Sequence, residues 1–378
     1  MKTLTDIAAS WADQRAERQQ RRHLDPADFK ALADAGFLLA AVPEAQGGTW
    51  QSVEASTRDL AGGLRVLAGG DPSVALVASM HPAVLSYWLS TEDPAQPAWA
   101  EQARAVCEVA RAGSQWGTIT SEPGSGGDVM RTRTRAERTD ETHELPGAVY
   151  RLSGDKHFGS GYGISDFMFT TAMPDDDDAP SAFFMDMRPV KAGTHSGITV
   201  VAEWDGAGMA ATQSHAARLE NMPAVRLAWD GPIETLVMNA GPLVSVLFTA
   251  VVLGVFDSAI ELAKQQLGSK RESMRAFEQV EWSRAEMDHW VATQAFEGAL
   301  RAVEAGDRYQ ALRAGLRAKT AVAEMAEQSL RRIGQVVGGG TFSRRSPFAS
   351  WFEDVRALGY LRPPWGLAFD TLFATSFD

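Results

Sequence analysis

The chain has 378 residues and a formal net charge of −12, and 45% of its residues are hydrophobic. This is an ordinary globular composition, and the length suffices for two or three domains. An acidic chain without a long basic run argues against nucleic acid and an anionic membrane as main partners. The single cysteine, Cys107, permits no disulfide within the chain and no cysteine-based metal site, so we expect no metal and a reducing, cytoplasmic location.

Residues 1–113 are expected to form a helical domain. Leu4, Ile7 and Trp11 recur at helical spacing, and the segment 25–36 begins with an Asp-Pro cap and ends at a glycine. The basic cluster in residues 15–22 is interleaved with glutamate and glutamine, which predicts a solvated helix face.

The pattern changes near residue 114. From there to residue 232, short segments rich in β-branched and aromatic residues alternate with turns, which predicts a central antiparallel β-barrel or β-sandwich. The predicted strands are 116–120, 132–139, 148–153, 167–172, 182–187, 197–202, 216–220 and 225–229.

Helical periodicity returns in residues 233–378, which are expected to form a bundle. The uncharged run 236–256 is long enough for a membrane span. However, Pro242 interrupts this run, and Asp257 and Glu261 continue it with helical spacing. We therefore expect a helix from Pro242 onward, with the proline in its first turn, buried in a protein core rather than in a membrane.

Two glycine-rich loops in the central part are candidate ligand loops. The first reads TITSEPGSGGD (118–128), and the second reads GDKHFGSG (154–161). Glycines let backbone N–H groups approach a flat or anionic ligand, and Phe158 and Ser160 add a ring and a hydroxyl. Each loop taken alone is also compatible with an ordinary turn.

Three motifs in this order resemble the acyl-CoA dehydrogenase superfamily. They are the two loops and the segment QVVGG (335–339), which is followed by Pro347 and by DVR at 354–356. The resemblance covers nearly the whole chain and implies an α+β fold with an N-terminal helical domain, a central antiparallel barrel or sandwich and a C-terminal four-helix bundle. It also implies a flavin, FAD or FMN, and a homo-oligomer, with a tetramer favoured.

The resemblance also assigns flavin contacts residue by residue. Phe158 stands where the family usually has a tryptophan stacked on the flavin ring, and Ser160 stands where it has a threonine near N5. Residues from the third motif would reach the diphosphate end from a neighbouring subunit. The complete set implied for the cofactor is Thr118, Thr120, Ser121, Gly126, Gly127, Phe158, Ser160, Lys270, Arg271, Gln335, Gly338 and Gly339.

A dehydrogenase of this family needs a carboxylate base, and the two positions that supply it align with Arg362 and near Val244. The resemblance is therefore nearer to the reduced-flavin-dependent monooxygenases. Their chemistry through a C4a-hydroperoxyflavin requires a dry pocket with hydroxyl or imidazole donors. The implied catalytic residues are His81, Ser160 and Arg362.

A monooxygenase of this kind implies a small-molecule substrate and a separate flavin reductase, and a fixed Arg362 favours an anionic substrate or the reduced flavin. Two alternatives stay open. A dehydrogenase with a non-standard base would take an acyl-type substrate and an electron-transfer flavoprotein. A relative without catalytic activity would only bind flavin or acyl groups.

Overall fold

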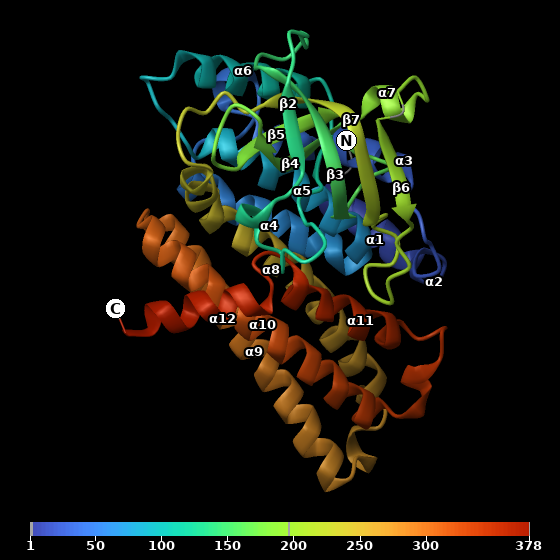
Figure 1. Ribbon diagram of the computed structural model, residues 1–378. Helices are drawn as coiled ribbons and strands as arrows, with labels where there is room; N and C mark the ends of the chain where they lie inside the picture. The colour runs from blue at the N-terminus through green and yellow to red at the C-terminus, as the bar shows by residue number, and fades with distance from the viewer. Residues whose placement is uncertain (1–2, 196, 378) are drawn as a thin grey trace.

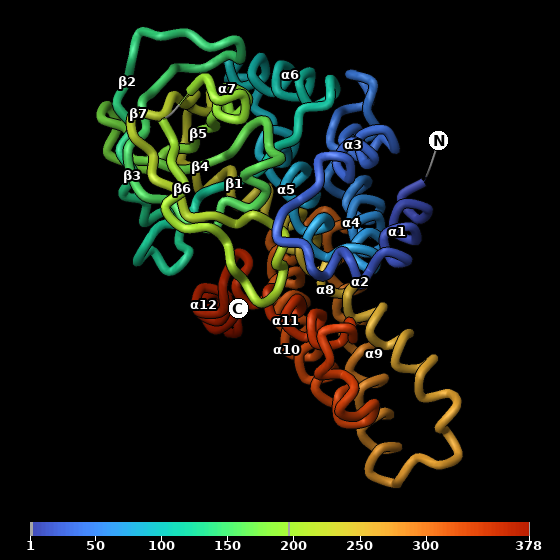
Figure 2. Tube along the Cα trace, turned by 90° about the vertical axis from the view of Figure 1, so that its right-hand side faces the viewer, coloured from blue at the N-terminus to red at the C-terminus, as the bar shows by residue number. Residues whose placement is uncertain are grey.

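The computed structural model describes residues 3–195 and 197–377. It is a mixed α+β structure in which helices come first, strands occupy the middle of the chain and helices return at the end (Figure 1). The sheet and the N-terminal helices lie side by side, and the C-terminal helices lie below both (Figure 2). This is the order of elements that the sequence predicts.

The N-terminal helices begin at capping residues. The side chains of Thr3, Asp25, Ser52 and Asp71 each accept a hydrogen bond from a backbone N–H of the first helical turn. The fifth helix is buried on almost all sides, so it forms the centre of this part. The helices are α1 (Leu4–Asp13), α2 (Arg15–Arg18), α3 (Pro26–Asp34), α4 (Val53–Gly70), α5 (Pro72–Leu89) and α6 (Pro97–Arg111).

The central strands form a mixed sheet, which corrects the prediction of purely antiparallel pairing. Both β1 and β2 run parallel to β4. The pairings close a ring in the order β4–β2–β3–β7–β5, with β1 added at β4 and β6 added at β7. The strands are β1 (Trp116–Thr118), β2 (Arg135–Arg138), β3 (Val149–Gly159), β4 (Phe167–Pro174), β5 (Ser181–Asp186), β6 (Ile198–Ala202) and β7 (His215–Arg226).

Two strands are longer than predicted. β3 continues through the second glycine loop to Gly159, where the sequence indicated a turn. β7 joins two predicted strands, because the residues between them keep their pairing with β3. A short helix, α7 (Arg188–Lys191), follows β5. Trp88 of α5 stacks on Trp99 of α6 and packs against Trp116 and Phe184 of the sheet, which joins the two parts.

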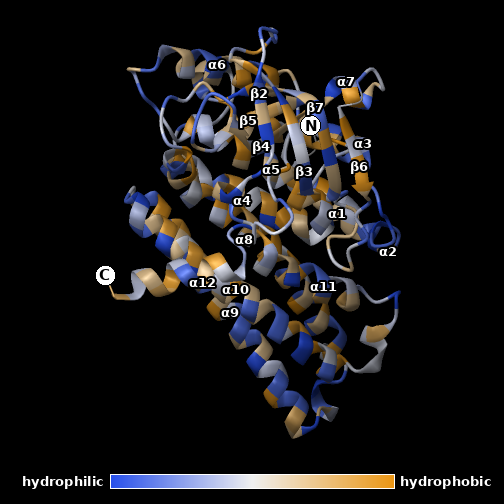
Figure 3. Ribbon diagram, viewed as in Figure 1, coloured by the Kyte–Doolittle hydropathy of each residue, from blue (hydrophilic) through white to orange (hydrophobic). Residues whose placement is uncertain are grey.

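The C-terminal part is organised around α8 (Ile233–Gly268), which packs against α4, α5, α9, α10 and α11. This helix starts before Pro242 and contains it, so the predicted start at the proline is wrong. Tertiary burial on both sides of the proline outweighs the one backbone hydrogen bond that it removes. The other helices are α9 (Ala276–Glu304), α10 (Arg308–Val337), α11 (Pro347–Tyr360) and α12 (Trp365–Ala374). In Figure 3, hydrophilic residues cover much of α9 and α10.

Helix α8 meets the length and composition criteria for a membrane span. However, 78% of its most apolar 18-residue segment is buried inside the protein. A core helix of a globular protein passes the same test, so this is weak evidence for a membrane span. Its burial agrees with the predicted core helix.

Candidate active site

A cavity of about 650 Å³ lies where the three parts of the chain meet. Helix α5 contributes Leu76 and Met80, and α8 contributes Phe248. The other walls come from the two glycine loops, from the β6–β7 connection and from the end of α11 with the turn after it. Those further lining residues are Thr118, Thr120–Gly124, Gly126, Gly127, His157, Phe158, Ser160, Trp204, Gly206–Met209, Thr212, Ser214, Glu353, Arg356, Ala357, Tyr360–Arg362 and Pro364.

The two glycine loops lie directly beside each other at the cavity. The backbone N–H of His157 donates to the carbonyl of Ser121 at 2.8 Å, and Thr118 pairs with Ser160 in an isolated bridge. Phe158 has a φ of +58°, a backbone conformation that is unusual for a bulky residue. Its side chain is 57% exposed and lines the cavity. This backbone turn interrupts strand alternation, so the neighbouring residues His157 and Phe158 both line the cavity.

A buried ion pair anchors the first loop to the sheet. Lys156 Nζ lies 2.6 Å from Glu122 Oε1 and also donates to the carbonyl of Thr171 at 2.6 Å. Burial opposes ionisation of Glu122, but Lys156 and neighbouring donors hold the pKa of Glu122 at about 2. Burial lowers the pKa of Lys156 to about 8, against the attraction of Glu122. Both groups are therefore charged near neutral pH, and the pair fixes the loop.

Three hydroxyls form a chain with a defined direction. Thr212 Oγ1 donates to the carbonyl of Met209 at 2.9 Å, which uses its only proton. Ser214 Oγ lies 2.7 Å from Thr212 Oγ1, so Ser214 must donate to Thr212. Ser160 Oγ lies 2.8 Å from Ser214 Oγ and must donate to Ser214 in turn. The lone pairs of Ser160 Oγ therefore remain free to accept a hydrogen bond from a ligand in the cavity.

Arg362 lies on the turn between α11 and α12, opposite the first loop. Its Nη2 donates to Ser121 Oγ at 3.1 Å. Burial lowers the pKa of Arg362, whereas Tyr87 and Asp128 act in the opposite direction. Arginine nevertheless keeps its charge at neutral pH.

Gly127 allows the turn after Arg362 to pack closely on the first loop. It has a φ of +83°, and a Cβ added there would lie 2.8 Å from Pro364 Cγ. A side chain at this position would therefore be strained by its backbone conformation and would also push Pro364 away.

The carboxylates that line the described cavity, Glu122 and Glu353, are both held by cations. Glu122 pairs with Lys156, and Glu353 Oε2 accepts a hydrogen bond from Arg356 Nη1 at 2.8 Å. The described lining therefore offers no unpaired carboxylate as a general base.

The structure brings eight predicted site residues to one cavity. They are Thr118, Thr120, Ser121, Gly126, Gly127, Phe158, Ser160 and Arg362.

His81 does not reach this cavity. It is fully buried on α5, where Nε2 faces the carbonyl of Leu38 and Nδ1 accepts the backbone N–H of Trp116, both at 3.3 Å. Burial lowers the pKa of His81 to about 4, so the ring is neutral at pH 7. Both ring nitrogens are occupied in joining α5 to η1 (Phe37–Ala41) and β1, and we leave His81 out of the site proposed below.

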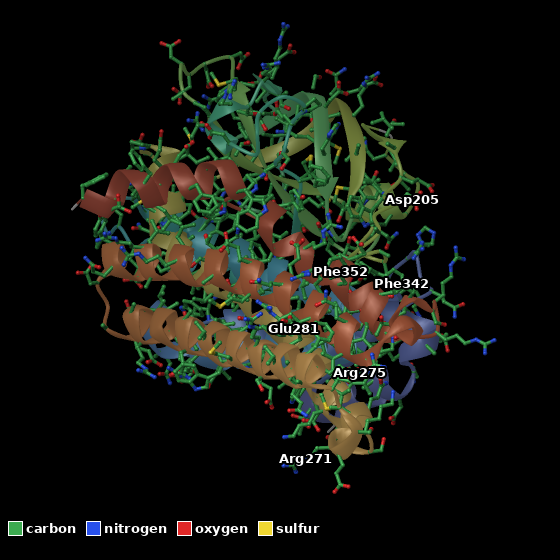
Figure 4. The ribbon with its side chains drawn as sticks, turned by 90° about the horizontal axis from the view of Figure 1, so that it is seen from below. Asp205, Arg271, Arg275, Glu281, Phe342 and Phe352 are labelled. Carbon is green, nitrogen blue, oxygen red and sulfur yellow. The ribbon has the colours of Figure 1, made fainter. Side chains whose placement is uncertain are left out.

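The remaining predicted cofactor residues also lie outside the cavity of their own chain. Lys270 and Arg271 connect α8 to α9, and Figure 4 shows Arg271 at the far end of the C-terminal helices. Gln335 lies in the last turn of α10, and Gly338 and Gly339 follow that helix. A contribution from a neighbouring copy stays a prediction for Gln335, Gly338 and Gly339, and a flavin contact stays a prediction for Lys270 and Arg271.

Sequence reasoning missed several residues that build the site. Glu122 and Lys156 belong to the first and second glycine loops. A glutamate and a lysine in two loops of one predicted site could have indicated an ion pair. Trp204, Thr212 and Ser214 belong to the β6–β7 connection, where no motif or periodicity marked them. Only the folded loop brings them to Ser160.

Comparisons with known proteins agree with this arrangement. No protein-family model matches the chain. A probable FMNH2-dependent monooxygenase of Pseudomonas putida, SfnC, is 28% identical over 269 residues, which cover 69% of this chain. The match spans only 60% of that relative's length. An amino sugar nitrososynthase of Streptomyces peucetius, DnmZ, is 28% identical over 89% of this chain and 82% of its own.

Solved structures show the same fold. The FMN-bound TdsC of Paenibacillus sp. A11-2 superposes with a TM-score of 0.80 over 98% of this chain and 95% of its own, at 18% sequence identity. The chain is thus similar in sequence to flavin-dependent enzymes and shares the fold of an FMN-bound one, which fits the suspected acyl-CoA dehydrogenase superfamily. In this chain, the two predicted glycine loops face one cavity.

Proposed function

We propose that this chain is a monooxygenase that uses reduced flavin supplied by a separate reductase. The observation that carries the proposal is the lining of the cavity: hydroxyls, glycine loops and Arg362, with both carboxylates already held by cations. A thioester dehydrogenase needs a free carboxylate to remove the α-proton. The relative named as an FMNH2-dependent monooxygenase and the FMN-bound solved structure support the same choice and favour FMN over FAD.

The lining residues fit a flavin. Phe158 presents an exposed ring to the cavity, and a Cβ added at Gly126 would meet no atom within 4 Å, so this loop leaves room for a ligand. A reduced flavin bound here would supply the electrons that activate oxygen.

The chain's own residues would orient the reactants and exclude water. Ser160 would accept a hydrogen bond, because its proton points to Ser214. Arg362 would hold negative charge, and Leu76, Met80 and Phe248 form an apolar wall suited to a small, largely apolar substrate.

Finer features of the architecture belong to the same proposal. We infer that the closed strand ring is the predicted barrel and that α8–α11 form the predicted four-helix bundle. We also infer a cytoplasmic homo-oligomer, with a tetramer favoured, in which the third motif of one copy reaches the flavin of another. Contacts among α8, α9, α10 and α11 support the bundle.

The experiment that tests the function compares two flavin states and one thioester. Anaerobic titration should give tighter binding for reduced FMN than for oxidised FMN. Butyryl-CoA, added anaerobically to protein with oxidised flavin, should leave the flavin absorbance unchanged. Bleaching by butyryl-CoA would contradict the proposal and favour the dehydrogenase alternative.

A further inference from the structure

A second cavity, of about 750 Å³, lies beside the first and is lined by arginines. We call it the arginine cavity. Ala207 and Glu353 line both cavities, so the two are neighbours. The arginines of its lining are Arg15, Arg18, Arg21, Arg22, Arg344 and Arg345.

The basic cluster 15–22 is thus not simply the solvated helix face that its sequence predicts. Arg18 is only 5% exposed and pairs with Asp28 at 2.6 Å and with Asp71 at 2.8 Å. Arg21 pairs with Asp28 and with Glu17. These two arginines are neutralised by the protein, and they fix the wall of the arginine cavity.

Four other arginines have no carboxylate partner among the described residues. Arg15 and Arg22 lie on the N-terminal wall, and Arg344 and Arg345 lie on the loop before α11. Such a concentration of unpaired positive charge is notable in a chain whose net charge is −12.

Arg15 carries a more specific signal. Its Nη2 donates to the carbonyl of Gly69 at 3.0 Å, and its guanidinium lies over the Trp351 ring at 4.9 Å. Its Nε is buried and has no hydrogen-bond partner. A buried N–H without an acceptor costs free energy unless a ligand or water supplies one.

Helix α11 adds a further set of donors. Ala349 and Ser350 in its first turns line the arginine cavity, and its N-cap Ser346 makes no side-chain capping bond. Helix N-termini carry partial positive charge and open N–H groups. Together with the unpaired arginines and Arg15 Nε, this favours an anion that accepts several hydrogen bonds at once.

Three carboxyl side chains in the lining weaken this field only in part. Asp71 pairs with Arg18, and Glu353 is bonded to Arg356. Burial raises the pKa of Asp354 to about 7, so this carboxyl is partly protonated near neutral pH. Phe342, which is 89% exposed, forms another part of the lining, and Figure 4 shows it on the side of the molecule where the N-terminal helices lie.

We propose that the arginine cavity binds a small molecule bearing a phosphate or diphosphate group, distinct from the flavin. Arginines on both walls would contact the phosphate oxygens, and the first turn of α11 would complete the contacts. The proposal does not depend on the reaction performed in the first cavity, because binding is measured without turnover.

The test is calorimetric titration of sodium pyrophosphate into FMN-saturated protein at constant ionic strength. Saturable binding to one site per chain is expected. Arg344→Ala/Arg345→Ala should weaken it at least about tenfold, the effect expected for losing charged hydrogen bonds. Arg22→Ala, on the opposite wall, should also weaken it. The control Arg104→Ala/Arg111→Ala removes two exposed arginines from α6 and should change the affinity less than twofold.

Three outcomes would overturn the proposal. One is the absence of saturable binding to the wild-type protein. Another is equal weakening by the variant pair and the control pair, which would indicate general attraction between charges. The last is competition between pyrophosphate and FMN, which would assign the arginine cavity to the phosphate of a flavin. Unfolding midpoints of all variants verify that they are folded.

Discussion

The Oγ atoms of Ser160 and Ser214 lie 2.8 Å apart, and the proton between them belongs to Ser160. This follows because Thr212 uses its own proton on the carbonyl of Met209 and Ser214 uses its proton on Thr212. Ser160 therefore presents an acceptor to the first cavity. The fully buried Thr212 thereby sets the polarity of the Ser160 hydroxyl.

Thr212→Val should lower oxygenation with little change in stability. Valine keeps the shape of threonine but removes the hydroxyl, so Ser214 becomes free to donate to Ser160 and reverse its polarity. The expected loss is about tenfold to a hundredfold in turnover, the scale of one misdirected hydrogen bond in a closed site.

The matched control is Thr320→Val, which removes a buried hydroxyl from α10 outside the cavity. Turnover with reduced FMN, measured by oxygen uptake, should stay within twofold of wild type. If Thr212→Val shows the same turnover as Thr320→Val, the hydroxyl chain does not direct Ser160.

His81→Ala should affect folding rather than chemistry. The substitution leaves the Trp116 N–H and the Leu38 carbonyl without partners and opens a void, which should cost about 2–4 kcal/mol of unfolding free energy. Chemical denaturation measures this loss. The affinity of the folded fraction for reduced FMN should be unchanged; a large fall in affinity at unchanged stability would restore His81 to the site.

Lys156→Met should be more harmful than the double variant Lys156→Met/Glu122→Gln. The single change leaves Glu122 buried and charged without its cation, which typically costs about 3–5 kcal/mol. Neutralising both members removes the unpaired charge, so part of the stability should return. Chemical denaturation of the two single variants and the double variant gives the coupling, and strict additivity would show that the ion pair contributes nothing.

Stability should fall as pH rises from about 4 to 7 because of Asp354. Burial raises its folded pKa to about 7, above the unfolded value of 3.8, so the folded state binds the extra proton in this range. Stability from this group is complete below the unfolded pKa and is lost as pH rises through the folded pKa. Each unit of pKa difference corresponds to about 1.4 kcal/mol.

The variant Asp354→Asn isolates this effect. The amide oxygen can still accept the N–H of Met209, which lies 2.6 Å from Asp354 Oδ1. Unfolding measured at pH 4.5 and pH 8 should show a smaller pH dependence for Asp354→Asn than for wild type. Asp370→Asn, at an exposed position on α12, should behave like wild type. Equal pH dependence in all three proteins would rule out Asp354 as the source.

The sequence predicted the order of helices and strands because apolar periodicity and caps are local signals. Through the resemblance it also assigned Thr118, Ser121, Phe158 and Ser160 to one site, and in the fold isolated bridges join the two loops that carry them. It misplaced the start of α8, because tertiary burial overrides a local helix breaker.

Other features had no local signal. The positive φ of Phe158, which turns both it and His157 toward the cavity, contradicts strand alternation. The hydroxyl chain depends on the path of the β6–β7 connection, and the arginine cavity combines helices from opposite ends of the chain. Such contacts between distant segments are fixed by the packing of three parts, which no short pattern in the sequence contains.

The most direct measurement of the central claim is rapid mixing of oxygen with protein that holds reduced FMN. The absorbance of oxidised flavin should return after a delay, more slowly than for free reduced FMN, because in the proposed complex the cavity would hold the flavin away from water and beside Ser160 and Arg362. Thr212→Val should shorten the delay, and Thr320→Val should preserve it. Reoxidation of the wild-type complex at the rate of free flavin, without a delay, would contradict the assignment of this chain as a reduced-flavin monooxygenase.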